Sequence, residues 1–153
     1  MKKKILFVVS LFVVGLSQAQ VALVDSTVTY DINGNAVSKL EYQYDSLGRK
    51  SATVGYEWIN GVKVGKDYTE TMYDKQNRKS QETTFRWDAV AEVYVGFERF
   101  NYSYDEAGNE IAKLREVYDT DEKDWFPTDK NECEYDDSHH LIRSEHFIMG
   151  DEN

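Results

Sequence analysis

Residues 42–49 read Tyr-Gln-Tyr-Asp-Ser-Leu-Gly-Arg, and this stretch contains a turn that the chain repeats. Asp is favoured at the first position of a type I turn because its carboxylate can accept N–H groups of the turn. Gly is favoured at the fourth position, where φ becomes positive. A Tyr-Asp pair followed by a residue that tolerates positive φ occurs five times, with these first and fourth positions: Asp31 and Gly34, Asp45 and Gly48, Asp74 and Asn77, Asp105 and Gly108, Asp136 and His139. Asn and His are among the few non-glycine types enriched at positive φ, so five hairpin turns are predicted.

A longer repeat of about 30 residues becomes visible when the chain is aligned on these pairs. Tyr44, Tyr73, Tyr104 and Tyr135 are separated by 29, 31 and 31 positions. Fourteen positions after three of these tyrosines an aromatic residue recurs: Trp58, Trp87 and Tyr118. A second loop follows each of them: Asn60-Gly61, residues 88–93 and residues 119–124. Each repeat is therefore predicted to be one strand out, a loop, and one strand back.

The segments between the turns predict an all-β fold. Nine strands are expected, over residues 24–31, 35–45, 49–58, 63–74, 78–88, 93–105, 109–118, 125–136 and 140–148. Connections this short require consecutive strands to pair, which gives an antiparallel β-meander. Tyrosine-rich faces with few leucines indicate a thin core, so an open curved sheet is favoured over a closed or partly closed barrel.

Strand alternation predicts which side chains share a face of this sheet. If Asp45 pairs with Arg49, then Tyr42 faces Ala52 and Leu40 faces Val54. Aromatic and apolar residues then occupy one face and polar residues the other. The same construction on Asp105 and Asn109 groups Phe100, Tyr102 and Tyr104 with Ala112, Leu114 and Tyr118.

Residues 1–19 are predicted to be a secretory signal peptide. Three lysines precede an apolar run that ends in the small residues of a cleavage site. The run is short for a membrane span, and no second one follows. A single domain, residues 20–153, is therefore expected to be exported to the periplasm or the exterior without a transmembrane segment.

The charge and the cysteine content restrict the partners. The formal net charge is −10, and no basic stripe suited to phosphate binding occurs, so nucleic acid is not an expected partner. Cys133 is the only cysteine and cannot form an internal disulfide, so strand pairing and packing must stabilise the fold.

The strings YQYDSLGR and YSYDEAGN resemble the YD repeat of Rhs-type secreted bacterial proteins. The whole layout resembles small secreted Bacteroidetes proteins of an uncharacterised family. The first resemblance implies β-hairpin repeats, and the second carries no activity with it.

Trp58, Trp87 and Trp125 are the candidate ligand-binding residues. Trp58 and Trp87 occupy equivalent repeat positions, and exposed aromatic rings at such an interval could stack on sugar rings. The alternative is that they are cross-strand packing residues, as aromatic side chains in strands commonly are.

Other reactive residues do not form a recognisable site in the sequence. Residues 119–124 resemble the start of a calcium loop, but the sixth position lacks glycine and the twelfth is Lys130. His139, His140 and His146 have no second cluster to complete a metal site. No motif of a known catalytic machinery occurs, so no catalytic residue, metal or cofactor is expected.

The sequence favours a secreted, non-enzymatic β-repeat module that binds a glycan, a surface component or a partner protein. The alternatives are a carboxylate-dependent glycan hydrolase and a purely structural or assembly element. An open meander leaves two edge strands. Any self-association or addition of a partner strand is expected to use the N-terminal edge near Val24 to Tyr30, because Asp25 is its only guard.

Overall fold

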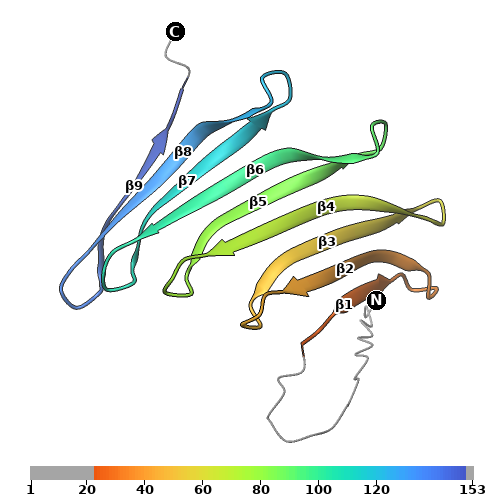
Figure 1. Cartoon of the computed structure of the whole chain (residues 1–153), viewed down its shortest axis with the longest axis horizontal. Coiled ribbons are helices and arrows are strands. Elements are labelled where there is room, and N and C mark those ends of the chain that lie inside the picture. Colours follow the sequence, from red (N-terminus) through yellow and green to blue (C-terminus); the bar gives the residue numbers. More distant parts are fainter. Residues whose placement is uncertain (1–22, 151–153) are drawn as a thin grey trace, which may run out of the picture. The chain divides into compact units, whose positions relative to one another are not determined.

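The computed structural model describes residues 23–150, so the predicted signal peptide lies outside the described residues. All regular elements in this range are strands (Figure 1). They are β1 (Ser26–Tyr30), β2 (Ala36–Tyr44), β3 (Lys50–Ile59), β4 (Val62–Tyr73), β5 (Lys79–Asp88), β6 (Val93–Tyr104), β7 (Glu110–Asp119), β8 (Asp124–Tyr135) and β9 (Leu141–Ile148). They form one antiparallel sheet in chain order that is not closed into a barrel, which confirms the predicted open meander.

The chain divides into two compact units, Met1–Tyr68 and Thr69–Asn153. The first contains the pairs β1–β2 and β2–β3 and the beginning of β4. The second contains the end of β4 and the consecutive antiparallel pairs from β5 to β9. The candidate site described below lies within the second unit.

The five Tyr-Asp turns share one backbone geometry. In each, the N–H of the fourth residue donates to the carbonyl of the Asp, over 2.9 to 3.2 Å. The fourth residue has a positive φ each time: Gly34 87°, Gly48 75°, Asn77 65°, Gly108 95° and His139 64°. Asn77 and His139 thus adopt the conformation that the glycines adopt in the other three turns.

The Asp side chain of each turn also holds the residue that follows the turn. In the second turn, the Asp45 carboxylate accepts the backbone N–H groups of Leu47 and Arg49. Its other oxygen accepts the Arg49 Nε–H at 2.7 Å. The residues at this fifth position differ, yet each brings a nitrogen of its side chain to the Asp: Asn35, Arg49, Arg78, Asn109 and His140.

The predicted assignment of side chains to faces is wrong because a β-bulge follows the turns. Tyr44 lies opposite Lys50 as expected, but Gln43, not Tyr42, lies opposite Ala52. One extra residue in the strand after the turn shifts the register by one, and this exchanges the faces. The bulged residues after the Tyr-Asp turns are Val37, Ser51, Ile111 and Ile142. Two further bulges lie within the other hairpins, at Phe97 in β6 and Thr128 in β8.

The bulges place basic side chains beside aromatic ones instead of forming an apolar face. Phe100 lies opposite Arg115, and Tyr102 lies opposite Lys113. The Lys113 ammonium is 4.3 Å from the centre of the Phe100 ring. Among the described residues Ala52 is the only buried hydrophobic side chain, so the thin core expected from the sequence is thinner still. Cation–π contacts and cross-strand pairs, each contributing roughly 0.5 to 1 kcal/mol, replace it.

Candidate functional site

A row of aromatic side chains lies near the loop end of the second unit. Trp87 on β5 lies opposite Tyr94 on β6. Their ring centroids are 5.1 Å apart, with the rings edge to face. Tyr118 on β7 and Trp125 on β8 form the same kind of pair, also 5.1 Å apart.

A glycine brings the two pairs onto one face of the sheet. A Cβ built on Gly96 would lie 2.6 Å from the Tyr118 ring, so the ring rests on the backbone of β6. Gly96 is two residues from Tyr94, and alternate residues of a strand point to the same face. Trp87, Tyr94, Tyr118 and Trp125 therefore share one face across β5 to β8, and we call them the aromatic row.

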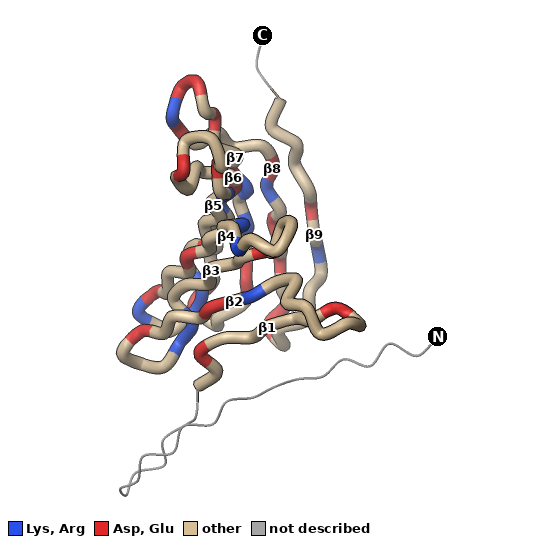
Figure 2. The backbone as a smooth tube through the Cα atoms, turned by 90° about the vertical axis from the view of Figure 1, so that its right-hand side faces the viewer, with Lys and Arg blue, Asp and Glu red and all other residues tan. Residues whose placement is uncertain are grey.

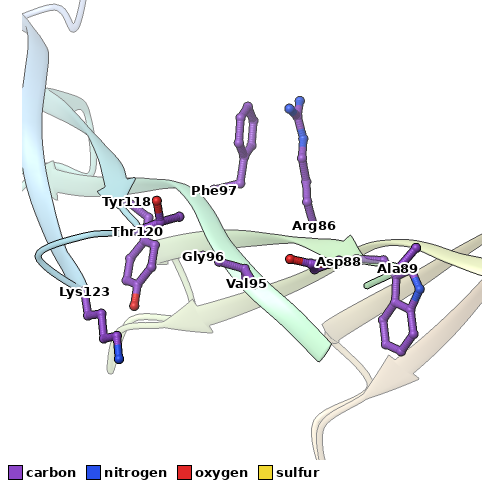
Figure 3. Close-up of a pocket in the computed structure, with 10 residues that line it drawn as sticks. Arg86, Asp88, Ala89, Val95, Gly96, Phe97, Tyr118, Thr120 and Lys123 are labelled. Carbon is purple, nitrogen blue, oxygen red and sulfur yellow. The ribbon is translucent and has the colours of Figure 1, made fainter. Parts of the chain in front are cut away.

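A shallow depression borders the aromatic row. It has a volume of about 710 Å³, and its lining includes Trp87, Tyr118 and Lys123. Figure 3 shows Tyr118 and Lys123 on one side of the strands, with Arg86 and Phe97 on the other. The Arg86 guanidinium stacks on the Phe97 ring at 3.3 Å and so belongs to the opposite face. The row thus presents half-buried rings at the rim of an open surface.

Charged groups hold the far end of the row. The Arg99 guanidinium lies 4.8 Å from the Trp125 ring centre and donates to the Glu116 carboxylate at 2.7 Å. The hydrogen bond from Arg99 holds the pKa of Glu116 below its usual value, against the opposing effect of burial. Glu116 is therefore a fixed anion, and together with Arg99 it orients the Trp125 end of the row.

The structure places the predicted tryptophans in two different units. Trp87 and Trp125 both belong to the aromatic row. Trp58 lies on β3 in the first unit, where it is half-buried. Tyr94 and Tyr118 are not among the ligand-binding candidates predicted from the sequence. Their signal was present, because Tyr118 occupies the repeat position of Trp87 and lies beside Trp125 across the hairpin.

The tyrosines of the Tyr-Asp turns make backbone contacts. The Tyr104 hydroxyl donates to the Lys79 carbonyl at 2.8 Å, and the Tyr135 hydroxyl to the Glu110 carbonyl at 3.3 Å. The Tyr44 hydroxyl donates to the Val24 carbonyl at 2.8 Å. Tyr104 and Tyr135 each join the end of one strand to the start of its neighbour, and Tyr44 joins the end of β2 to the residues just before β1. The recurring Tyr thus has a structural role beside that of the Asp.

The acidic loop that resembles a calcium loop caps its own turn. The Asp119 carboxylate accepts the N–H groups of Asp121 and Glu122. Across residues 23–150 no three His, Cys, Asp or Glu side chains are arranged to hold a metal ion.

Cys133 is half-buried, with its sulfur 3.9 Å from the Ser144 hydroxyl. In the described range, residues 23–150, no helix is long and apolar enough to cross a membrane.

Comparison with solved structures finds a protein of similar fold and matches others less closely. The crystal structure of a protein of unknown function from Bacteroides fragilis has a TM-score of 0.61 at 14% identity, covering 74% of this chain and 81% of that one. A DUF3836 family protein from Parabacteroides distasonis has a TM-score of 0.46 at 22% identity, covering 72% and 90%. One from Bacteroides vulgatus has a TM-score of 0.47 at 12% identity, covering 58% and 90%.

The Bacteroides fragilis structure shows that this fold occurs in another protein, and it shows the fold alone. No protein-family model matches the chain, and no curated protein is similar to it in sequence. This protein of unknown function from Bacteroides fragilis is consistent with the expected likeness to an uncharacterised Bacteroidetes family. It does not support the resemblance to YD-repeat proteins of the Rhs type.

Proposed function

We propose that the protein is a non-enzymatic binding module and that the aromatic row binds a glycan. The observation that carries the proposal is the placement of four rings from four neighbouring strands on one open face. Sugar rings present flat C–H faces that pack on aromatic rings, and their hydroxyls bind charged side chains at the rim. Lys123 at the depression and Arg99 beside Trp125 supply such groups.

The geometry favours binding over glycan hydrolysis. A glycosidase needs two carboxyl groups that converge on one bond, about 5 to 10 Å apart. Among the described residues that line the depression, Asp88 is the one with a carboxylate, and it already accepts the N–H groups of Val90 and Ala91. A second, smaller depression is lined by several acids, but Arg143 there pairs with both Glu134 and Glu145.

The proposal is tested by screening the purified protein on an array of neutral and acidic oligosaccharides. We expect binding to one class of glycan, with a decrease of about fivefold or more when Trp87 is replaced by Ala. Stacking of a flat ligand ring on one aromatic side chain contributes on the order of 1 to 3 kcal/mol in the related case of nucleobases. Phe100→Ala is the matched control, since Phe100 is a half-buried aromatic residue on the opposite face.

Two outcomes contradict the proposal. Equal loss of binding in Trp87→Ala and Phe100→Ala would place the ligand elsewhere. Absence of any bound glycan, combined with recovery of a specific partner in a pull-down, would favour the protein-binding or structural alternatives.

The proposed setting is the periplasm or the cell exterior, reached through the leader at residues 1–19. This part is checked by N-terminal sequencing of protein recovered outside the cytoplasm, which should begin at Gln20. A chain that retains Met1 and remains with the cytoplasmic fraction would contradict it.

A further inference from the structure

The two ends of the meander differ in how well they could pair with a second copy. Within residues 23–150, β1 and β9 each have one neighbour in the sheet and so leave one edge open. An open edge presents unpaired N–H and C=O groups to any strand that can reach it. β9 has eight residues, whereas β1 has five.

The backbone direction of β9 fixes which residues can pair outward. The Met149 N–H donates to the Thr128 carbonyl of the β8 side at 2.8 Å. Alternate residues of an antiparallel strand bond to opposite neighbours, so Ile148, His146 and Ser144 direct their N–H groups away from β8. A two-fold pairing of β9 with its own copy can therefore be centred on Ser144.

The side chains of β9 are self-complementary about that centre. The pairing would place Arg143 opposite Glu145 of the second copy, twice. Within β9 these two side chains already form an ion pair, 2.7 Å apart, so both lie on one face of the strand. The two pairs between copies would be non-hydrogen-bonded, the kind in which side chains approach most closely. Registers centred on Arg143 or on Glu145 would instead place like charges opposite each other.

The exposed side chains of β9 are consistent with an edge strand that pairs with a second copy. Leu141 is 54% exposed, Ile142 63% and Ile148 80%. Figure 2 shows a basic and an acidic segment close together on β9, with the outer side of this strand open. The opposite charges at the middle of the strand, on the residues beyond the bulge at Ile142, are the arrangement that an antiparallel copy matches.

The N-terminal edge, favoured by the sequence alone, is the weaker candidate. The Tyr42 N–H donates to the Asp25 carbonyl, so Val28 directs its N–H away from β2. A pairing centred on Val28 would place Asp25 opposite Asp31 of the second copy. Such like charges at both ends of a five-residue strand oppose association.

We propose that the protein forms a two-fold dimer by pairing β9 with β9 of a second copy, in the register centred on Ser144. The dimer axis is perpendicular to the sheet, so the aromatic rows of both copies lie on the same face of the joint sheet. The dimer does not depend on what the aromatic row binds.

Charge exchange tests the register. In sedimentation velocity over a range of concentrations, Arg143→Glu should lower the association constant by about tenfold or more, because it creates two like-charge pairs. Combining Arg143→Glu with Glu145→Arg should restore association, since each exchanged residue again faces its opposite. Failure of the double variant to recover would overturn the register.

Proline substitution tests the edge. Ser144→Pro should abolish association and leave β9 paired with β8, because the N–H that it removes points outward. Val28→Pro removes an outward N–H at the other edge and should leave the dimer intact. Hydrogen exchange should show protection at Ser144 and His146 that grows with concentration. A monomer at all concentrations, or loss of the dimer in Val28→Pro alone, would overturn the proposal.

Discussion

At the scale of single residues, each Tyr-Asp turn depends on the hydrogen bonds of one Asp and on the backbone conformation of one residue three positions later. The Asp accepts the N–H groups of the turn and a side-chain donor from the residue after it, and the fourth residue adopts positive φ. The fifth-position residues are Asn, Arg or His, which are chemically different but all carry nitrogen groups. What the fifth positions of the five turns have in common is therefore a side-chain nitrogen that reaches the Asp, and not a residue type.

Replacing Gly48 by Val should destabilise the fold by about 1 kcal/mol or more, because a β-branched residue is strained at positive φ. The cost would come from the backbone alone, since no atom lies within 4 Å of a Cβ built at Gly48. Urea denaturation measures the difference in the free energy of unfolding.

Two controls accompany this substitution. Gly48→Asn should be nearly neutral, because Asn77 occupies the equivalent place at φ 65°. Thr53→Val places the same residue on an ordinary strand position. Equal stability of Gly48→Val and Thr53→Val would show that the left-handed conformation at Gly48 does not matter.

At the scale of strands, the bulges determine which side chains share a face of the sheet. No pattern in the sequence marks the positions of these bulges. The strand boundaries follow from turn chemistry, so each predicted boundary lies within two residues of the observed one. The bulged positions after the Tyr-Asp turns are held by Val37, Ser51, Ile111 and Ile142, so no single residue type marks them. One unrecognised residue per hairpin was enough to exchange the faces, because side chains in a strand repeat every two residues.

Gly96→Ala should destabilise the second unit, because the added methyl group would meet the Tyr118 ring at 2.6 Å. Strain of this kind costs about 1 to 3 kcal/mol when the neighbour cannot move away. Thermal unfolding of the variant, compared with the unmodified protein, measures the loss.

A double-mutant cycle separates this contact from a general effect of losing glycine. Tyr118→Ala removes the ring, so Gly96→Ala should cost much less in that background. Gly55→Ala in the first unit is the matched substitution at a glycine in a strand, where the nearest atom would lie at 3.4 Å. A cost of Gly96→Ala that is unchanged without Tyr118 would contradict the proposed packing.

At the scale of the molecule, the chain relies on repeated local interactions and not on a common core. Topology was predictable because short connections leave no other pairing. The aromatic row was predictable only in part: Trp87 and Trp125 stand out as residues, but their shared face depends on bulges and on the glycine under Tyr118. Trp58 showed the same repeat position and lies in the other unit.

The stability of the fold should decrease below about pH 4, because the turn aspartates have lower pKa values in the folded chain than in the unfolded chain. The hydrogen bonds from the Asn35 and Asn109 side chains hold the pKa values of Asp31 and Asp105 below the usual 3.8, and the backbone N–H of His140 acts in the same way on Asp136. Their contribution is complete above the unfolded pKa and is lost as the pH falls through the lowered folded values.

Substitution by Asn at Asp31, Asp105 and Asp136 together tests this dependence. The triple variant should be less stable at pH 7 and should lose less stability on acidification than the unmodified protein. Denaturation curves at several pH values give both quantities. Identical slopes below about pH 4 would show that other acids cause the acid limb.

The meander order also has a consequence for how fast the protein folds. Each strand pairs with the one before it, so the chain never has to close a long loop before a contact forms. Folding rates rise as contacting residues become closer in sequence, and an isolated hairpin forms in roughly 1 to 10 μs. A β protein of this kind should fold faster than sandwiches of similar length, whose strands pair across distant parts of the chain.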